Sequence, residues 1–328
     1  MGKKIRFNNI SDFIIFGGGE LVFEICSYLI KNKKKIVVIS SSKQINEKII
    51  FFGQSLKEYL IKNKIKFIIL KNLDNQSKWS HLVDRETLGI SSSCKWIFKQ
   101  KEIDLFDGRL LNMHSSNLPS FRGGGGLTWN ILMQNFQSGT TIHLIEKKID
   151  AGFSIINKSF IFPKNIRNSL TKMQKYSMKI QKKIINEFLR KIVQKKFFYK
   201  KKIHSTFKSF YWPRLSTQKN AWINWTWDAY EIVNFINAFS HPYEGAATYL
   251  NKKVVRIQKA RIKKENLVFH PFQYGLIYKI FKNKVYVGAK SEGIVIDIKD
   301  LKIKKGLLGK RLYTLNNKLE KSFEKAII

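Results

Sequence analysis

The chain has 328 residues, of which 44% are hydrophobic and 13% aromatic, with a formal net charge of +38 and only 19 glycines and 5 prolines. This composition excludes a wholly disordered protein, and no apolar run approaches the roughly 20 residues that a membrane-spanning helix needs. Because the N-terminus lacks the apolar segment of a secretory signal, and the distant Cys26 and Cys94 offer neither a disulfide framework nor a metal cluster, we expect a soluble, cytoplasmic protein.

The first elements along the chain predict a parallel sheet. A β-branched and aromatic strand at Asp12–Phe16 is followed by a glycine turn, an apolar-periodic helix at Leu21–Ile30 and a second strand at Ile36–Ile39. The order strand, glycine turn, helix, strand is typical of a βαβ unit. Further strands are predicted at Phe67–Leu70, buried, and at Gly89–Ser93, Arg109–His114, Thr140–Ile145 and Ser154–Ile161, with helices at Leu56–Ile61, Ile97–Phe106 and Arg167–Lys196.

The glycine turn Gly17-Gly18-Gly19-Glu20 resembles part of a nicotinamide-binding fingerprint, but two elements are missing. Val22 stands where the fingerprint has a third glycine or alanine, and Ser40–Lys43 holds no acidic residue to close the second strand. A dinucleotide site is therefore not expected. The turn can present backbone N–H groups to an anion at a helix N-terminus, and a plain tight-turn role is equally compatible with it.

Asn112 and His114 are the candidate residues for chemistry. They stand two apart on one predicted strand, so their side chains share a face, and they lie at its carboxyl end, where open α/β sheets bind ligands. A carboxamide and an imidazole can stabilise a developing oxyanion. Asp150, in a predicted loop, could orient the imidazole and raise its pKa. Each of these residues alone is more commonly explained by turn capping or surface solvation.

After Asn220 the pattern changes to a short helix at Asp228–Ala238 and short alternating strands, which predict a small β-barrel or sandwich. The strands are expected at Val254–Ala260, Gly275–Phe281, Val285–Ala289 and Gly293–Ile298. We therefore divide the chain into a first domain with its closing helix and linker over residues 1–202, a second domain over 203–302, and a basic, partly helical tail over 303–328.

Three segments carry a resemblance to a known family. Gly108–Pro119 (GRLLNMHSSNLP), Arg122-Gly123 and Gly139–Gly152 together resemble the 10-formyltetrahydrofolate-dependent formyltransferases. Their motif is Asn-x-His on a strand, then Ser-x-Leu-Pro, then an Asp-x-Gly loop. The resemblance implies a Rossmann-like formyltransferase domain followed by an OB-like barrel, with Asn112, His114 and Asp150 as catalytic residues.

The same resemblance implies direct transfer of a formyl group from 10-formyltetrahydrofolate to a primary amine, without a covalent enzyme intermediate or a metal. Asn112 and a protonated His114 would stabilise the oxyanion, while Asp150 would keep His114 charged. The donor is expected to contact Asn112, Asp150 and three residues in the segment Ser93–Phe98, namely Lys95, Trp96 and Ile97. The expected acceptor-binding residues are Gly17, Gly18, Gly19, Ser116, Arg122 and Gly123.

The acceptor is left open between two classes. The segments WINW at Trp222–Trp225 and PYEGA at Pro242–Ala246 resemble the C-terminal domain that methionyl-tRNA and sugar-nucleotide formyltransferases share, the second being closer to the sugar branch. In addition, Ser40–Gln54 lacks the arginine and proline of the basic loop in the tRNA enzymes. An amino-sugar nucleotide is therefore the favoured acceptor and Met-tRNA the alternative, and a homodimer is possible.

The net charge permits a third hypothesis, a basic protein that binds nucleic acid without catalysing a reaction. Lys and Arg number 61 against 23 Asp and Glu, which suits a polyanionic partner such as tRNA. However, the lysines are spread along the chain, whereas nucleic-acid binders usually concentrate charge on one face. The abundance of Lys, Ile, Asn and Phe is also what an A/T-rich coding sequence yields, and we favour this compositional explanation.

Overall fold

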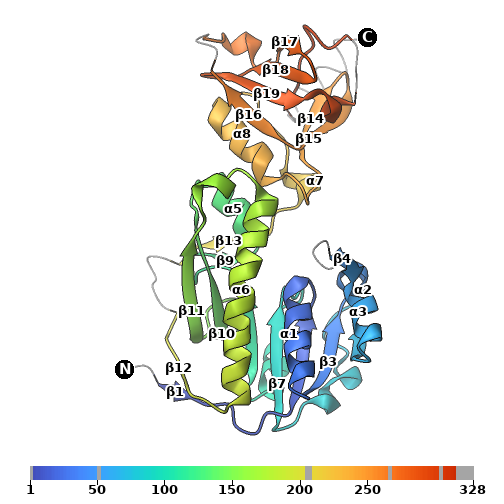
Figure 1. The fold of residues 1–328 in the computed structure, drawn as a ribbon, viewed down its shortest axis with the longest axis vertical. Helices are drawn as coiled ribbons and strands as arrows, with labels where there is room; N and C mark the ends of the chain where they lie inside the picture. The colour runs from blue at the N-terminus through green and yellow to red at the C-terminus, as the bar shows by residue number, and fades with distance from the viewer. Residues whose placement is uncertain (1–2, 50–52, 204–208, 265–267, 303–305, 315–328) are drawn as a thin grey trace. The chain divides into compact units, whose positions relative to one another are not determined.

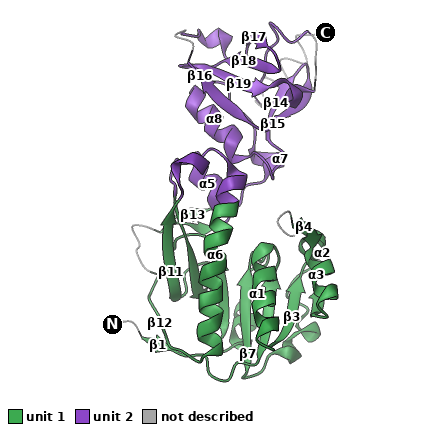
Figure 2. Ribbon diagram, viewed as in Figure 1, with its two compact units in different colours: residues 1–123, 137–161, 175–212 green, residues 124–136, 162–174, 213–328 purple. Residues whose placement is uncertain are grey.

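The computed structural model describes residues 3–49, 53–203, 209–264, 268–302 and 306–314. The chain divides into two compact units (Figure 2): unit 1 comprises residues 1–123, 137–161 and 175–212, and unit 2 comprises residues 124–136, 162–174 and 213–328. Among the described residues, no helix combines the length and the apolar character needed to cross a bilayer.

Unit 1 is built on a seven-stranded mixed sheet with the order β11-β10-β8-β7-β2-β3-β6 (Figure 1). The strands are β2 (Asp12–Gly17), β3 (Lys35–Ser40), β6 (Lys66–Ile69), β7 (Thr87–Ser92), β8 (Leu110–His114), β10 (Gln137–Leu144) and β11 (Ser154–Ile161). Five of them, β2, β3, β6, β7 and β8, run parallel. β10 is antiparallel to both β8 and β11. The prediction of a parallel sheet is therefore correct for β2, β3, β6, β7 and β8. It is wrong for β10, which pairs antiparallel with both of its neighbours.

Both faces of the sheet are covered, which is why its central strands read as nearly continuous apolar runs. On β2, Phe13 and Ile15 pack into a core formed with α1 (Glu20–Lys31), α2 (Ser42–Asn46), α3 (Leu56–Lys62) and α6 (Leu170–Val193). The alternate residues Ile14 and Phe16 pack into a second core with the segment around Trp79 and α4 (Gln100–Leu105). Unit 1 also contains short strands away from the main sheet, among them β1 (Lys4–Ile5), β4 (Lys48–Ile49), β5 (Gln54–Ser55) and β12 (Phe198–Tyr199).

The parallel strands end at one edge of the sheet, and this edge positions the polar residues discussed below. Gly17 at the end of β2 pairs with Ser92 at the end of β7, and Met113 on β8 also pairs with Ser92. Two further strands, β9 (Arg122–Gly123) and β13 (Tyr211–Trp212), pair in parallel although they lie almost 90 residues apart.

Unit 2 contains α5 (Gly126–Leu132), α7 (Thr217–Asn220), α8 (Ala229–Ala238) and two antiparallel sheets. β14 (Ala246–Leu250) pairs with β15 (Lys253–Ile257). The second sheet has the order β16-β19-β18-β17, made of β16 (Ala260–Lys263), β17 (Ile277–Phe281), β18 (Lys284–Gly288) and β19 (Gly293–Asp297).

Three expectations differ from the structure, and a fourth is not tested by it. β6 is not buried because it forms the edge of the sheet, with Ile69 exposed. The helix expected at Ile97–Phe106 begins only at Gln100, where Glu102 accepts the N–H of Lys99 as a cap. The strand expected at Val254–Ala260 is divided into β15 and β16, and β14 was not predicted. The tail beyond residue 314 lies outside the described residues, so its helical content stays a prediction.

Candidate functional site

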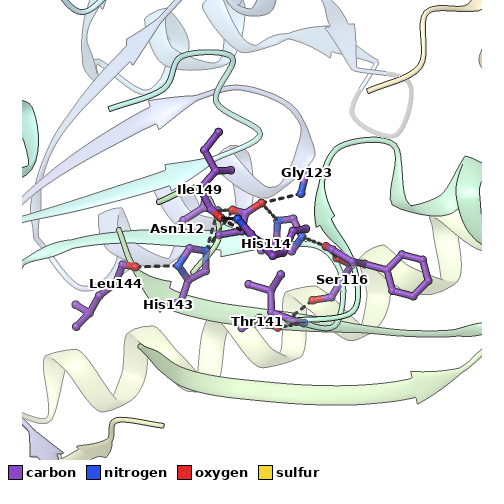
Figure 3. A network of polar contacts seen from close by, with 12 residues as sticks. Asn112, His114, Ser116, Gly123, Thr141, His143, Leu144 and Ile149 are labelled. Atoms are coloured by element: carbon purple, nitrogen blue, oxygen red, sulfur yellow. Dashed lines mark hydrogen bonds and ion pairs between the residues drawn. The ribbon is translucent and has the colours of Figure 1, made fainter. Parts of the chain in front are cut away.

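Asn112 and His114, both labelled in Figure 3, lie close to each other in unit 1, and Asp150 contacts both of them. Asn112 and His114 project from the same face of β8. β10 is antiparallel to β8, so it runs away from the edge of the sheet at which β8 ends. The chain that follows β10 starts beside Leu110, at the other end of β8, where the N–H of Ile145 donates to the Leu110 carbonyl. It then returns to place Asp150 Oδ1 3.4 Å from Asn112 Nδ2 and Asp150 Oδ2 3.8 Å from His114 Nδ1. A carboxylate that is distant in the sequence thus joins two polar groups from one strand.

His114 is neutral at pH 7, which corrects the expectation of a charged imidazole. Burial lowers its pKa below the ordinary 6.5 and outweighs the raising effects of Asp150 and of the Phe121 carbonyl. His114 Nε2 lies 2.6 Å from that carbonyl oxygen, an acceptor, so Nε2 carries the proton. Nδ1 is therefore unprotonated, and it faces Asp150.

Asp150 stays ionised throughout the physiological pH range. Burial by itself raises its pKa, but His143, His114 and the Gly123 N–H together lower it to about 2. The Gly123 N–H donates to Asp150 Oδ2 over 2.8 Å. Asp150 also has a left-handed backbone with a φ of 50°, which is uncommon for a residue with a side chain. Its conformation therefore depends on the contacts around it.

Arg122 supplies several of those contacts. Its Nε and Nη2 donate to the Ile149 carbonyl over 3.0 and 2.6 Å, and its Nη1 donates to Ser209 Oγ over 3.3 Å. Arg122 and Gly123 thus hold the Asp150 loop from the β9 side, and their expected contacts with the acceptor stay a prediction.

We expect Arg122→Gln to loosen this loop, because glutamine cannot make the forked contact with Ile149. Amide hydrogen exchange of residues 147–152 should accelerate about tenfold or more, since about 1.4 kcal/mol of lost protection corresponds to a factor of ten. The control is Arg85→Gln, which removes an exposed arginine elsewhere in the unit. Equal exchange in both variants would show that Arg122 does not hold the loop.

His143, on β10, belongs to the same cluster but was not singled out from the sequence. It is 2% exposed, pairs in register with Asn112, and places Nε2 3.2 Å from Asn112 Nδ2 and 3.6 Å from Asp150 Oδ1. Its Nδ1 lies 2.8 Å from the Leu144 carbonyl oxygen. A histidine inside an otherwise uncharged predicted strand was the available signal.

The glycine turn is shaped by close packing. Gly17 has a φ of +117°, and a Cβ there would lie 2.1 Å from the Ser92 carbonyl oxygen. The Gly18 N–H donates to the same oxygen over 3.2 Å, and Gly19 precedes α1 as its N-cap. Burial raises the pKa of the adjacent Glu20 to about 7. Acceptor binding by the three glycines stays a prediction.

The residues expected to contact the donor differ in exposure. The Trp96 indole N–H donates to the Lys71 carbonyl over 3.0 Å, and its ring packs against the second core. Ile97, by contrast, is 66% exposed, and Lys95 lies with Nζ 5.6 Å from the Trp96 ring centre. Ser116, expected to bind the acceptor, is buried and donates its hydroxyl to the Phe121 carbonyl over 2.8 Å. The binding roles of these four residues stay predictions.

Curated relatives match the chain at modest identity. The bifunctional polymyxin resistance protein ArnA of Wigglesworthia glossinidia brevipalpis is 28% identical over 331 residues, covering 96% of this chain and 48% of that protein. A methionyl-tRNA formyltransferase of Buchnera aphidicola subsp. Schizaphis graminum is 30% identical over 166 residues, 49% of this chain and 50% of that protein. The chain thus spans about half the length of these relatives.

Solved structures show the same fold. A sugar 3N-formyl transferase, WlaRD, in the presence of dTDP and 5-N-formyl-THF, superimposes with a TM-score of 0.65 at 22% identity, covering 88% of this chain and 98% of that chain. An N-formyltransferase from Helicobacter canadensis in complex with folinic acid and dTDP-3-aminofucose gives a TM-score of 0.65, again at 22% identity, with 88% and 99% covered.

Two family models match consecutive parts of the sequence. The model described as formyl transferase matches residues 12–187, and the model described as formyl transferase, C-terminal domain, matches residues 215–313. The first match covers more than half of the chain and includes Asn112, His114 and Asp150. The protein therefore belongs to the formyl transferase family.

Proposed function

We propose that this protein transfers the formyl group of 10-formyltetrahydrofolate to the primary amine of an amino-sugar nucleotide. The observation that carries the proposal is the convergence of Asn112 and His114 on Asp150 in unit 1, at 3.4 and 3.8 Å from its carboxylate oxygens. Membership of the formyl transferase family supports the same reaction class.

The three side chains have complementary roles in this reaction. Asn112 Nδ2 donates to the formyl oxygen as negative charge develops there, a contact typically worth about 3–4 kcal/mol in the transition state. His114, neutral with a free Nδ1, takes the proton that the attacking amine loses, and returns it to N10 of the folate as the bond between the formyl carbon and N10 breaks and tetrahydrofolate leaves. The resulting imidazolium lies against the ionised Asp150 carboxylate, which stabilises its charge.

The segment after β7 fits the donor. Ile97 offers an exposed apolar side chain, and the backbone of residues 93–97 follows a strand end at the carboxyl edge of the sheet. 10-Formyltetrahydrofolate would supply an activated formyl carbon. The Trp96 ring packs against the second core, and its indole N–H already donates to the Lys71 carbonyl. Ile97 and the backbone are therefore the better candidates for contacts with the formyl donor.

An amino-sugar nucleotide is the acceptor that the comparisons favour. The matches to methionyl-tRNA formyltransferases cover only between 46% and 64% of this chain, whereas the sugar N-formyltransferase structures cover 88% of it. The two solved neighbours contain dTDP or a dTDP-linked aminosugar. Met-tRNA is the second candidate, supported by those formyltransferase relatives and by the net charge of +38.

The test is incubation with 10-formyltetrahydrofolate and either a panel of dTDP- and UDP-linked amino sugars or Met-tRNA, with release of tetrahydrofolate as the signal. Turnover with a sugar nucleotide supports the proposal. Turnover with Met-tRNA alone, together with tRNA binding that weakens steeply with salt, would establish the second candidate. Salt-sensitive tRNA binding without turnover of any acceptor would instead favour the non-catalytic nucleic-acid-binding hypothesis.

We also propose that the second domain is an OB-like barrel. The support is a set of short antiparallel strands, β14 to β19, with the helix α8 and bridges that join Tyr249 to Tyr313 and Leu276 to Arg311. The domain limits at residues 202 and 302, the homodimer and the cytoplasmic location stay predictions.

A further inference from the structure

The orientation of the Asn112 carboxamide can be deduced from His143. His143 Nδ1 lies 2.8 Å from the Leu144 carbonyl oxygen. A carbonyl oxygen only accepts hydrogen bonds, so Nδ1 carries a proton and donates it. In a neutral imidazole the other nitrogen, Nε2, is then a bare acceptor.

Two acceptors face the same end of the carboxamide. Asn112 Nδ2 lies 3.2 Å from His143 Nε2, a contact that Figure 3 shows, and 3.4 Å from Asp150 Oδ1. An amide oxygen at this position would meet a lone pair and a negative charge, whereas an NH2 group satisfies both. The end of Asn112 that faces His143 and Asp150 is therefore the NH2 group.

We propose that His143 is a positioning residue that keeps Asn112 turned with its NH2 group toward the reacting groups. One N–H is held by His143 Nε2. The other makes only a long contact of 3.4 Å with Asp150, so it can move to the formyl oxygen when charge develops there. This inference rests on the proposed formyl transfer, and it adds a fourth residue to the site.

The competing arrangement is a charged His143 whose Nε2–H donates to Asp150. The groups that face His143 are Asp150, Asn112 and the imidazole of His114, whose ring centre is 6.5 Å away. Nε2 is 3.6 Å from Asp150 Oδ1, beyond hydrogen-bond distance, and closer to Asn112. A proton on Nε2 would also require the Asn112 oxygen to turn toward the Asp150 carboxylate. The geometry therefore favours the neutral form.

The tautomer can be measured without any activity assay. We expect ¹⁵N spectra of histidine-labelled protein at pH 7 to show His143 as a neutral imidazole protonated at Nδ1, with the signal assigned by its loss in His143→Gln. An imidazolium, or a neutral ring protonated at Nε2, would overturn the proposal. Because this result needs no turnover, it stands even if the proposed reaction is wrong.

Kinetics test what His143 does for Asn112. His143→Gln can place an amide oxygen near the position of Nε2 and should retain most of kcat, whereas His143→Phe keeps bulk but offers no acceptor. We expect kcat to fall about 100-fold in His143→Phe, the usual loss for one misplaced oxyanion donor, with little change in the KM of the acceptor. His81→Gln, an exposed histidine outside the cluster, is the control and should behave as the wild type.

A double-mutant cycle separates positioning from a merely structural role. If His143 acts through Asn112, then Asn112→Ala should cost little more in the His143→Phe background than His143→Phe costs alone. Additive losses would mean that the two residues act independently, and an unchanged kcat in His143→Phe would refute the proposal. If the wild type transfers no formyl group at all, the proposed function fails, which is a different outcome from either of these.

Discussion

Asp150→Asn should lower the kcat of formyl transfer by about a thousandfold, within the range associated with loss of a positioned acid–base group. Asparagine has nearly the same shape but carries no charge, so it cannot stabilise the imidazolium that forms when His114 takes the amine proton. Donor binding, measured directly by titration, should remain within a few-fold of the wild type. The matched control is Asp107→Asn, which removes an exposed carboxylate whose ion pair is with Arg109.

The pH profile makes the same prediction more specific. Asp150 has a pKa of about 2 and does not titrate in an ordinary assay. In the proposed mechanism the base form of His114 is the active one, so kcat/KM should fall as the pH drops through the pKa of His114, which lies below 6.5. Asp150 raises that pKa, and its loss should therefore move the acid limb to lower pH. An Asp150→Asn variant with full activity, or with its acid limb at higher pH, would contradict these roles.

Gly17→Ala should destabilise unit 1 by about 3 kcal/mol or more, among the larger effects seen for single substitutions. Two causes combine at this position: the φ of +117°, which side chains rarely adopt, and the Ser92 carbonyl oxygen 2.1 Å from the new Cβ. Neither strand can easily shift to relieve the clash between the new Cβ and the Ser92 carbonyl oxygen, because β2 and β7 are paired at the centre of the sheet. The measurement is the urea midpoint of unfolding.

Gly108→Ala separates these two causes. Gly108 also has a positive φ, of +75°, but nothing lies within 4 Å of its added Cβ. Its substitution should therefore cost only the backbone term, about 1–2 kcal/mol. Equal losses in the two variants would show that the contact with Ser92 is not what requires glycine at residue 17.

The sequence was sufficient to predict the centre of the sheet. The runs around Phe13 and Ile90 are apolar because both faces of the sheet are covered, and such runs can be recognised as buried strands from the sequence alone. The proximity of Asn112 and His114 could also be predicted, because the two-residue period of a strand puts their side chains on one face. Their convergence with Asp150 was expected from the family motif.

The missed features depend on tertiary structure. His143 joins the site only because β10 pairs antiparallel with β8 in a register that sets it opposite Asn112, and no local pattern specifies that register. The neutral state of His114 follows from its burial, which a motif does not encode. The prediction of a charged His114 was wrong because it took into account only the Asp150 carboxylate, which raises the pKa of His114. It left out the burial of the imidazole, which lowers that pKa by more.

The pairing of β9 with β13 sets a minimum length for an intact site. A fragment that stops at residue 203 would contain Asn112, His114 and Asp150, yet it would lack Ser209 and the strand that lies against Arg122 and Gly123. The carboxylate loop would then lose part of its support, although every group assigned to the chemistry was present. Truncated forms made for enzymology should therefore extend past Trp212, beyond the limit that the N-terminal family match alone suggests.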